Sequence, residues 1–153
     1  MKNIKLFEEY FWGNVAAGIL PICTETKRIL VGFRSKHVHM GECWGTIGGK
    51  LDIESENIDI IKSEALREFE EECEFYGKMK LYNAYVYVNK ESDFRYYNFI
   101  GEVKEEFKPV LNWENTEIKW FTYDELLKLK NKHLGLIELL NNSKDLINKV
   151  LNT

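Results

Sequence analysis

The chain has 153 residues, of which 44% are hydrophobic and 30% are charged, and its formal net charge is −4. This size and composition predict one soluble globular domain, residues 1–153, with a single core. Apolar runs fall short of the roughly 18 residues that a bilayer span needs, and the mixed charges of Met1 to Tyr10 lack the apolar stretch of a signal peptide. A net negative charge opposes nonspecific attraction to nucleic acid.

Cysteine usage indicates a reducing compartment. Cys23, Cys43 and Cys73 are odd in number and scattered, so we expect free thiols rather than a disulfide framework, in a cytoplasmic protein. The sequence contains no repeat or low-complexity linker, and Pro21 and Pro109 are its only prolines. One compact unit is the expected organisation.

The first predicted elements are strands. Val15 to Cys23 and Arg28 to Phe33 are rich in β-branched residues and flank a polar turn, which predicts a hairpin. Trp44 to Ile47 predicts a short strand that ends at a turn containing the glycine pair Gly48-Gly49. A helix is then expected from Ile58 or Asp59 to Phe75.

The second half predicts more strands and then helices. Tyr82 to Asn89 and Arg95 to Val103 alternate aromatic and aliphatic residues around a turn, and Glu117 to Phe121 is a further strand. Tyr123 to Lys130 and Leu134 to Leu151 carry leucines at helical spacing. The order of elements predicts an α/β fold with a mixed sheet.

The central helix carries an unusual concentration of negative charge. Four of its carboxylates share one face: Glu64, Glu68, Glu71 and Glu72. Each like-charged pair at this spacing destabilises a bare helix by roughly 0.2–0.5 kcal/mol. Beside them, Ala65, Leu66, Phe69 and Cys73 form an apolar stripe, so the helix packs on a core and its carboxylates hold a fixed orientation. That arrangement favours a metal site over a solvated acidic surface.

The same segment resembles the Nudix box, whose second half reads Arg-Glu-hydrophobic-x-Glu-Glu-x-Gly-hydrophobic. The positions that match this half are Arg67, Glu68, Phe69, Glu71, Glu72 and Phe75. The segment from Glu117 to Leu126 is similar to the strand-to-helix step near the end of many Nudix domains. The resemblance implies a Nudix-type α/β/α sandwich with a mixed central β-sheet over nearly the whole chain.

The spacing before the helix departs from the family pattern. Eighteen positions lead from Gly49 to Arg67, where the pattern has fourteen, so the intervening loop is longer. The position of the first acid of the box therefore has alternatives: counting back from Arg67 gives Asp59, and counting forward from Gly49 gives Ser55. The acids that flank Ser55 are Glu54 and Glu56.

The end of the helix also departs from the pattern, because Glu74 stands where the family has glycine. Glycine there permits a left-handed turn, which in another residue costs about 1–2 kcal/mol. Gly77, three residues later, is an alternative place for that turn.

The resemblance implies a set of metal ligands: the carbonyl of Gly48 and the carboxylates of Glu68, Glu71 and Glu72. These hard oxygen donors suit Mg²⁺, with Mn²⁺ as a substitute. By the same resemblance, Arg67 anchors an acid of the preceding loop, which here is Glu54, Glu56 or Asp59.

The catalytic residues implied by the resemblance are Arg67, Glu68, Glu71 and Glu117. The general base stays open between Glu68 and an acid from outside the box, for which Glu117 and Glu114 are the candidates.

Three further groups of residues bear on ligands. Zinc-type ligands occur at His37, His39 and Cys43, but a fourth is missing, so a polar loop is preferred. Aromatic residues that could face a nucleobase are Trp12, Phe33, Trp44, Tyr96 and Tyr97. Basic residues that could meet phosphates are Arg34, Lys36, Lys50 and Arg95.

The expected function is that of a Mg²⁺-dependent Nudix hydrolase cleaving a phosphoanhydride bond in a small nucleoside diphosphate linked to another group X. Candidates include nucleoside triphosphates and ADP-ribose, whereas capped RNA and membranes are not expected partners; a homodimer stays open. The alternatives are a catalytically silent nucleotide-sensing module and a variant that attacks a nucleotide sugar at carbon.

Overall fold

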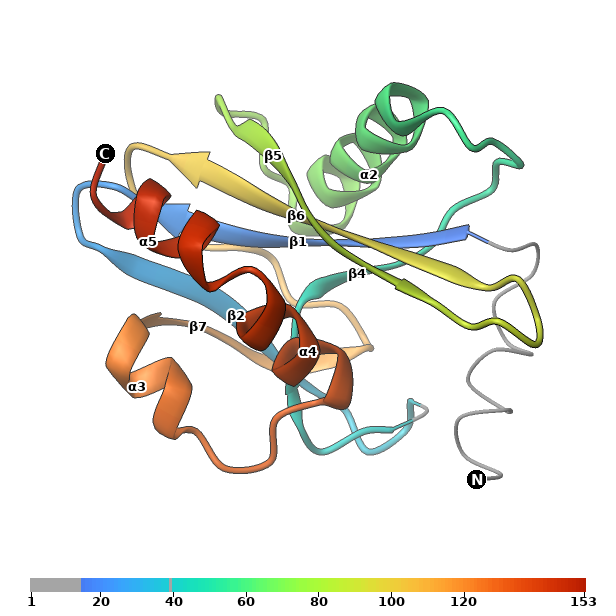
Figure 1. The fold of residues 1–153 in the computed structure, drawn as a ribbon. Helices are drawn as coiled ribbons and strands as arrows, with labels where there is room; N and C mark the ends of the chain where they lie inside the picture. The colour runs from blue at the N-terminus through green and yellow to red at the C-terminus, as the bar shows by residue number, and fades with distance from the viewer. Residues whose placement is uncertain (1–14, 39) are drawn as a thin grey trace.

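The computed structural model describes residues 15–38 and 40–153. Its strands are β1 (Val15–Cys23), β2 (Arg28–Arg34), β3 (Trp44–Gly45), β4 (Ile47–Lys50), β5 (Lys80–Val88), β6 (Arg95–Val103) and β7 (Asn115–Thr122). Its helices are α2 (Ile58–Cys73), α3 (Tyr123–Lys128), α4 (Leu134–Asn142) and α5 (Lys144–Leu151). The order of elements follows the predicted one (Figure 1).

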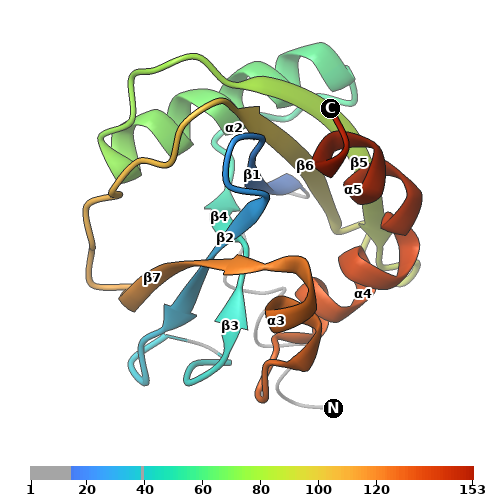
Figure 2. The same ribbon diagram turned by 90° about the vertical axis from the view of Figure 1, so that its left-hand side faces the viewer.

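The strands form one mixed sheet that opens between β1 and β2. These two strands pair beside their turn, Ile22 with Ile29 and Cys23 with Arg28. β1 then runs parallel to β6 and antiparallel to β4, whereas β2 runs antiparallel to β3 and β7. The sheet therefore has two wings that diverge from a shared hairpin (Figure 2).

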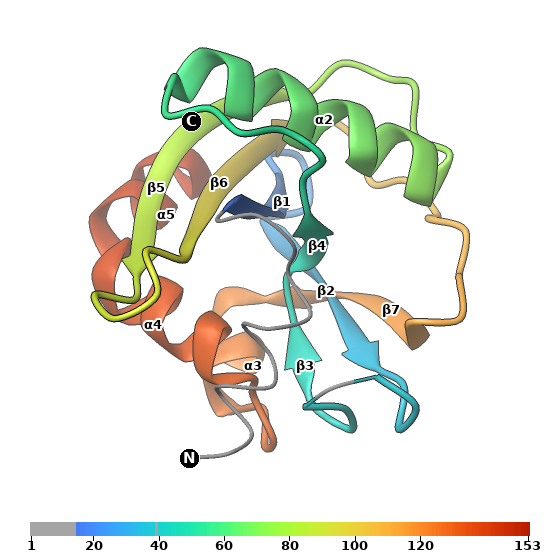
Figure 3. The same cartoon turned by 90° about the vertical axis from the view of Figure 1, so that its right-hand side faces the viewer.

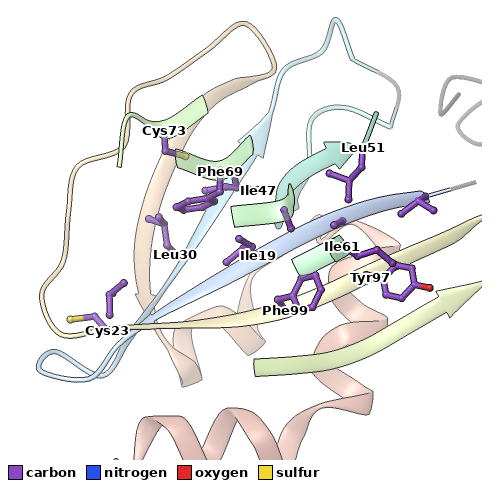
Figure 4. Packing of buried hydrophobic residues seen from close by; sticks show 14 of the residues in the cluster. Ile19, Cys23, Leu30, Ile47, Leu51, Ile61, Phe69, Cys73, Tyr97 and Phe99 are labelled. Atoms are coloured by element: carbon purple, nitrogen blue, oxygen red, sulfur yellow. The ribbon is translucent and has the colours of Figure 1, made fainter. Parts of the chain in front are cut away.

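Helices cover both faces of the sheet, as Figure 3 shows. On one face, Ile61, Ala65 and Phe69 of α2 pack on alternate residues of β1 and β6, such as Ile19 and Phe99 (Figure 4). On the other face, α3, α4 and α5 pack on the β1 and β6 residues that alternate with those of the first face, and together they form a second apolar cluster. This arrangement confirms the predicted α/β/α sandwich. In the described residues, every helix is too short or too polar to cross a lipid bilayer.

The glycine pair was predicted in a turn, and this prediction was wrong. Gly48 and Gly49 lie inside β4, where they pair with Gly18 and Ala17 of β1. A Cβ at residue 48 would collide with the carbonyl oxygen of Ala17. Glycine is therefore needed here because it lets β4 approach β1 closely.

The C-terminal helix was predicted as one element but is broken at Ser143, between α4 and α5. The Ser143 hydroxyl accepts a hydrogen bond of 3.1 Å from the backbone N–H of Tyr85. Tyr85 lies in a register irregularity between Asn83 and Val86, where β5 leaves the regular ladder with β6. A tertiary contact thus fixes the position of this break.

The end of α2 also differs from expectation. Glu74 itself takes the left-handed conformation, with φ 51° and ψ 42°, and its N–H donates to the carbonyl of Glu70. Phe75 then folds back against Phe69, with ring centroids 6.1 Å apart. Gly77 does not supply the turn; its lack of a Cβ makes room for the ring of Phe75.

Candidate active site

The acidic face of α2 is organised by Arg67. Its guanidinium donates to Glu64 at 2.8 Å, to Glu68 at 3.0 Å and to Glu71 at 2.9 Å. The bonds to Glu64 and Glu71 raise the pKa of Arg67, and Arg67 in turn lowers the pKa of Glu64. The arginine is therefore the cation that offsets the crowding of carboxylates on this face.

The predicted partner of Arg67 was an acid of the preceding loop, and the structure corrects this. Among the described residues, Arg67 forms its ion pairs with Glu64, Glu68 and Glu71 of its own helix, and Asp59, in the first turn of that helix, is not among these partners. Glu54 and Glu56 instead line a separate polar depression with Asp93 and Arg95. The longer loop before α2 therefore places Glu54 and Glu56 away from the middle of the helix.

Glu72 faces inward, away from Arg67. Burial raises the pKa of Glu72 to about 7, and the nearby charges of Glu114, Glu68 and Glu71 add to the increase. Such a partly buried carboxylate among like charges is stabilised by a proton or by a metal cation. Glu72 is thus a partly buried carboxylate of α2 on which the charges of Glu68, Glu71 and Glu114 act together.

Glu114 is the outside acid that approaches Glu72. It precedes β7, where its backbone carbonyl accepts a 2.7 Å bond from Ser35 and its N–H donates to Asn112 Oδ1. Burial raises the pKa of Glu114, and Arg34 opposes that shift. Glu117, the outside acid placed in the predicted catalytic set, is exposed on β7 opposite Phe33, and its charge is not among those that act on Glu72.

An aromatic cavity of about 130 Å³ opens on the face of the sheet opposite α2. Its walls come from the end of β2 and the loop after it, from β3 to β6, and from the start of α4. The aromatic and polar residues that line it include Arg34, Thr46, Gly48, Tyr85, Tyr87, Phe94, Tyr96, Asn98, His133 and Glu138. Gly48 borders the cavity from β4, which places the glycine pair between the cavity and the α2 side of the sheet.

One of the five aromatic residues predicted for a base-binding face, Tyr96, lines this cavity. Tyr97 points to the other face and joins the core with α2. Phe33 packs edge-on against Trp44, and Trp44 against Phe121. Trp12 lies outside the described residues.

Sequence reasoning missed most of the cavity wall. Tyr85 and Tyr87 lie two residues apart on β5, as do Tyr96 and Asn98 on β6, so each pair shares one face of its strand. That alternation was the available signal. No such alternation predicted that His133, at the N-terminus of α4, would line the cavity.

The candidate phosphate-binding residues are separated in space. Arg34 lines the cavity and acts on the charge of Glu114, so it stands between the cavity and the acids. Lys50 pairs with Asp52 at 3.4 Å, Arg95 lies in the second depression, and Lys36 is exposed. Arg34 is the basic residue best placed for both regions.

The donor set on α2 has the chemistry of a site for a hard divalent cation. Glu68, Glu71 and Glu72 offer carboxylate oxygens, with Glu114 nearby and Glu72 held among like charges. Over residues 15–38 and 40–153, no three acids, histidines or cysteines converge closely enough to form a ready metal cage, and Arg67 forms ion pairs with two of the glutamates. The zinc alternative gains no support among these residues, and His39 lies outside them.

The family model of the NUDIX domain matches residues 13–141, which is most of the chain. The chain belongs to the Nudix family. No curated protein matches it. The predicted family and the expectation of a Nudix hydrolase are therefore confirmed at the level of the domain.

Solved structures share the Nudix fold with this chain at low identity. The Nudix hydrolase RenU from M. smegmatis is 19% identical, with a TM-score of 0.65, over 92% of this chain and 87% of its own. An Ap4A hydrolase from C. elegans is 17% identical, with a TM-score of 0.63, over 88% and 98%. The NUDIX domain of Shewanella oneidensis NrtR, complexed with ADP ribose, is 15% identical, with a TM-score of 0.59, over 85% and 87%.

Proposed function

We propose that this Nudix protein is a divalent-metal-dependent hydrolase that cleaves a phosphoanhydride bond in a small nucleoside diphosphate linked to another group. One observation carries the proposal: the charges of Glu68, Glu71 and Glu114 act on Glu72, and Arg34, which acts on Glu114, also lines an aromatic cavity. A nucleotide has the matching chemistry, with a planar base at one end and phosphates at the other.

The cavity supports binding of the base. Tyr85, Tyr87, Phe94 and Tyr96 offer aromatic surface, on which a planar heterocycle stacks favourably. From there the phosphates would extend past Arg34, whose planar guanidinium suits phosphate oxygens, toward α2.

The residues that would hold Mg²⁺, or Mn²⁺ in its place, are Glu68, Glu71 and Glu72 with the carbonyl of Gly48. When bound, such an ion neutralises phosphate charge and lowers the pKa of water. Arg67 keeps Glu68 and Glu71 neutralised and oriented in its absence.

The reaction has a defined balance of bonds. The oxygen of a water molecule attacks phosphorus, the bond from phosphorus to the bridging oxygen breaks, and that oxygen leaves with the electron pair. A carboxylate accepts the proton of the attacking water. Glu68 and Glu114 are the candidates that the geometry supports, and Glu117 is the more exposed alternative.

Small nucleotides are the proposed substrate class. The structural neighbours include proteins solved with ADP ribose or named for Ap4A, which supports nucleotide derivatives as the first compounds to test. The net charge of −4 disfavours capped RNA. Free thiols at Cys23, Cys43 and Cys73 support a cytoplasmic setting.

The test is a panel of ATP, GTP, ADP-ribose and diadenosine tetraphosphate with Mg²⁺ or Mn²⁺, read by the release of nucleoside monophosphate and phosphate. At least one compound should be cleaved, EDTA should abolish cleavage, and added metal should restore it. Label from ¹⁸O-water should enter a phosphate. Binding without turnover would indicate the sensing module, and label on the sugar would indicate attack at carbon.

A further inference from the structure

Two hydroxyl groups meet in the wall of the aromatic cavity. The hydroxyl of Tyr96 on β6 lies 3.3 Å from Oγ1 of Thr46, which links β3 to β4. Both residues line the cavity. They come together directly over Gly18 of β1: a Cβ there would collide with the Tyr96 hydroxyl and lie 2.7 Å from Thr46 Oγ1. The absence of a side chain at Gly18 therefore makes room for this pair.

The pair also lies next to the acidic region. The charges of Arg34, Glu72 and Glu114 all reach the Tyr96 hydroxyl. Gly48, which pairs with Gly18, is two residues from Thr46. The two hydroxyls therefore occupy the junction between the cavity and the carboxylates that the proposed reaction uses.

The pair can donate one hydrogen bond to a ligand. Burial raises the pKa of Tyr96, so its phenol is neutral and keeps its hydrogen. Two hydroxyls carry two hydrogens, and the contact between them uses one. The second is available for an acceptor, for which an anionic phosphate oxygen is the strongest partner.

We infer that Tyr96 and Thr46 form a hydroxyl pair that binds the phosphate attached to the ribose, at the point where a nucleotide leaves the cavity for α2. This assignment rests on the proposed function, because it requires a nucleotide with its base in the cavity. It adds a binding role to two residues that the acidic motif on α2 does not include.

The experiment removes each hydroxyl and compares two ligands. Tyr96→Phe and Thr46→Val each keep the shape of the wall while deleting one hydroxyl, and the double variant deletes both donors. The matched control is Tyr82→Phe, because the Tyr82 hydroxyl on neighbouring β5 bonds Glu102 at 2.8 Å and is not among the residues that line the cavity. Calorimetry without metal measures the nucleoside monophosphate that the wild-type chain binds best among AMP, GMP, CMP and UMP, together with the corresponding nucleoside.

The double variant Tyr96→Phe/Thr46→Val should weaken binding of the monophosphate about tenfold, which is the effect of losing one charge-assisted hydrogen bond. Binding of the nucleoside should change less than about twofold, since the ring remains for stacking. Each single variant leaves one hydroxyl that can still donate to the phosphate, so its loss should be smaller. Tyr82→Phe should change neither ligand. With a hydrolysed substrate and Mg²⁺, KM should rise in the same proportion while kcat changes little.

Unchanged monophosphate binding by the double variant Tyr96→Phe/Thr46→Val would overturn the assignment. So would an equal loss for nucleoside and monophosphate, because that pattern reports ring packing. Wild-type binding that depends on Tyr96, without hydrolysis of any panel compound, would refute the proposed function and leave the hydroxyl pair standing. A chain that neither binds nor hydrolyses nucleotides would refute both.

Discussion

The two halves of the candidate site are built in opposite ways. The acids of α2 lie within one stretch, from Glu64 to Glu72, and the helical period alone brings them to one face. The aromatic cavity takes its wall from two sheet wings, a loop and the start of α4, which are distant in sequence. The positions of the acids are thus set by the local sequence of α2, whereas the aromatic cavity, where substrate selection is expected, depends on the tertiary fold.

The largest effect should come from the inward-facing acid. Glu72→Gln removes the partly buried carboxylate on which Glu68, Glu71 and Glu114 act, while keeping the side-chain shape, so kcat should fall about 100-fold or more. In EDTA the variant should melt at the same temperature as the wild type or slightly above it, because carboxylate repulsion is relieved. Steady-state hydrolysis and a thermal melt check the two outcomes.

Glu70→Gln is the matched control, since Glu70 lies on the same helix and its charge is not among those that act on Glu72. It should retain the parent rate. Equal losses in Glu70→Gln and Glu72→Gln would mean that the net charge of α2, rather than a site, controls activity.

A smaller effect should separate the two outside acids. Glu114→Gln should lower kcat by about 10- to 100-fold, because Glu114 is half-buried and acts on Glu72 across the boundary between α2 and the loop before β7. Glu117→Gln makes the same chemical change at an exposed position on β7. Its kcat should stay within about twofold of the parent, a much smaller loss than that of Glu114→Gln. Steady-state kinetics on the two variants measure the difference in kcat. A larger loss in Glu117→Gln than in Glu114→Gln would favour Glu117 as the catalytic acid.

Sequence reasoning succeeded where neighbours in the chain are neighbours in space. The fold order and the acids of α2 follow from periodicity, which needs no tertiary information. The glycine pair was placed in a turn because the close approach of Gly48 to Ala17 exists only after β4 pairs with β1. Likewise, the break at Ser143 depends on the freed N–H of Tyr85.

The cavity should respond through binding rather than rate. Tyr87→Leu removes aromatic stacking surface while keeping the wall apolar, so KM for a cleaved nucleotide should rise about tenfold, with kcat little changed. Val88→Leu, one residue away on β5 and outside the residues that line the cavity, serves as the control. A fall in kcat with unchanged KM would show that the base lies elsewhere.

The smallest effect concerns stability at the end of α2. Glu74 holds a left-handed conformation with φ 51°, which glycine adopts without the steric penalty of a Cβ. Because glycine also loses more chain entropy on folding, Glu74→Gly should stabilise the fold by a net of about 1 kcal/mol or less, or up to a few degrees in melting temperature. Gly77→Ala is the contrasting variant: a Cβ there would lie 2.9 Å from the ring of Phe75, so the melting temperature should fall. Activity of Glu74→Gly should match the parent, since Glu74 follows the helix that carries the acids. A changed kcat would mean that the exact end of α2 sets the positions of these acids. The acidic half of the site would then depend on more of the structure than the helical spacing of its residues.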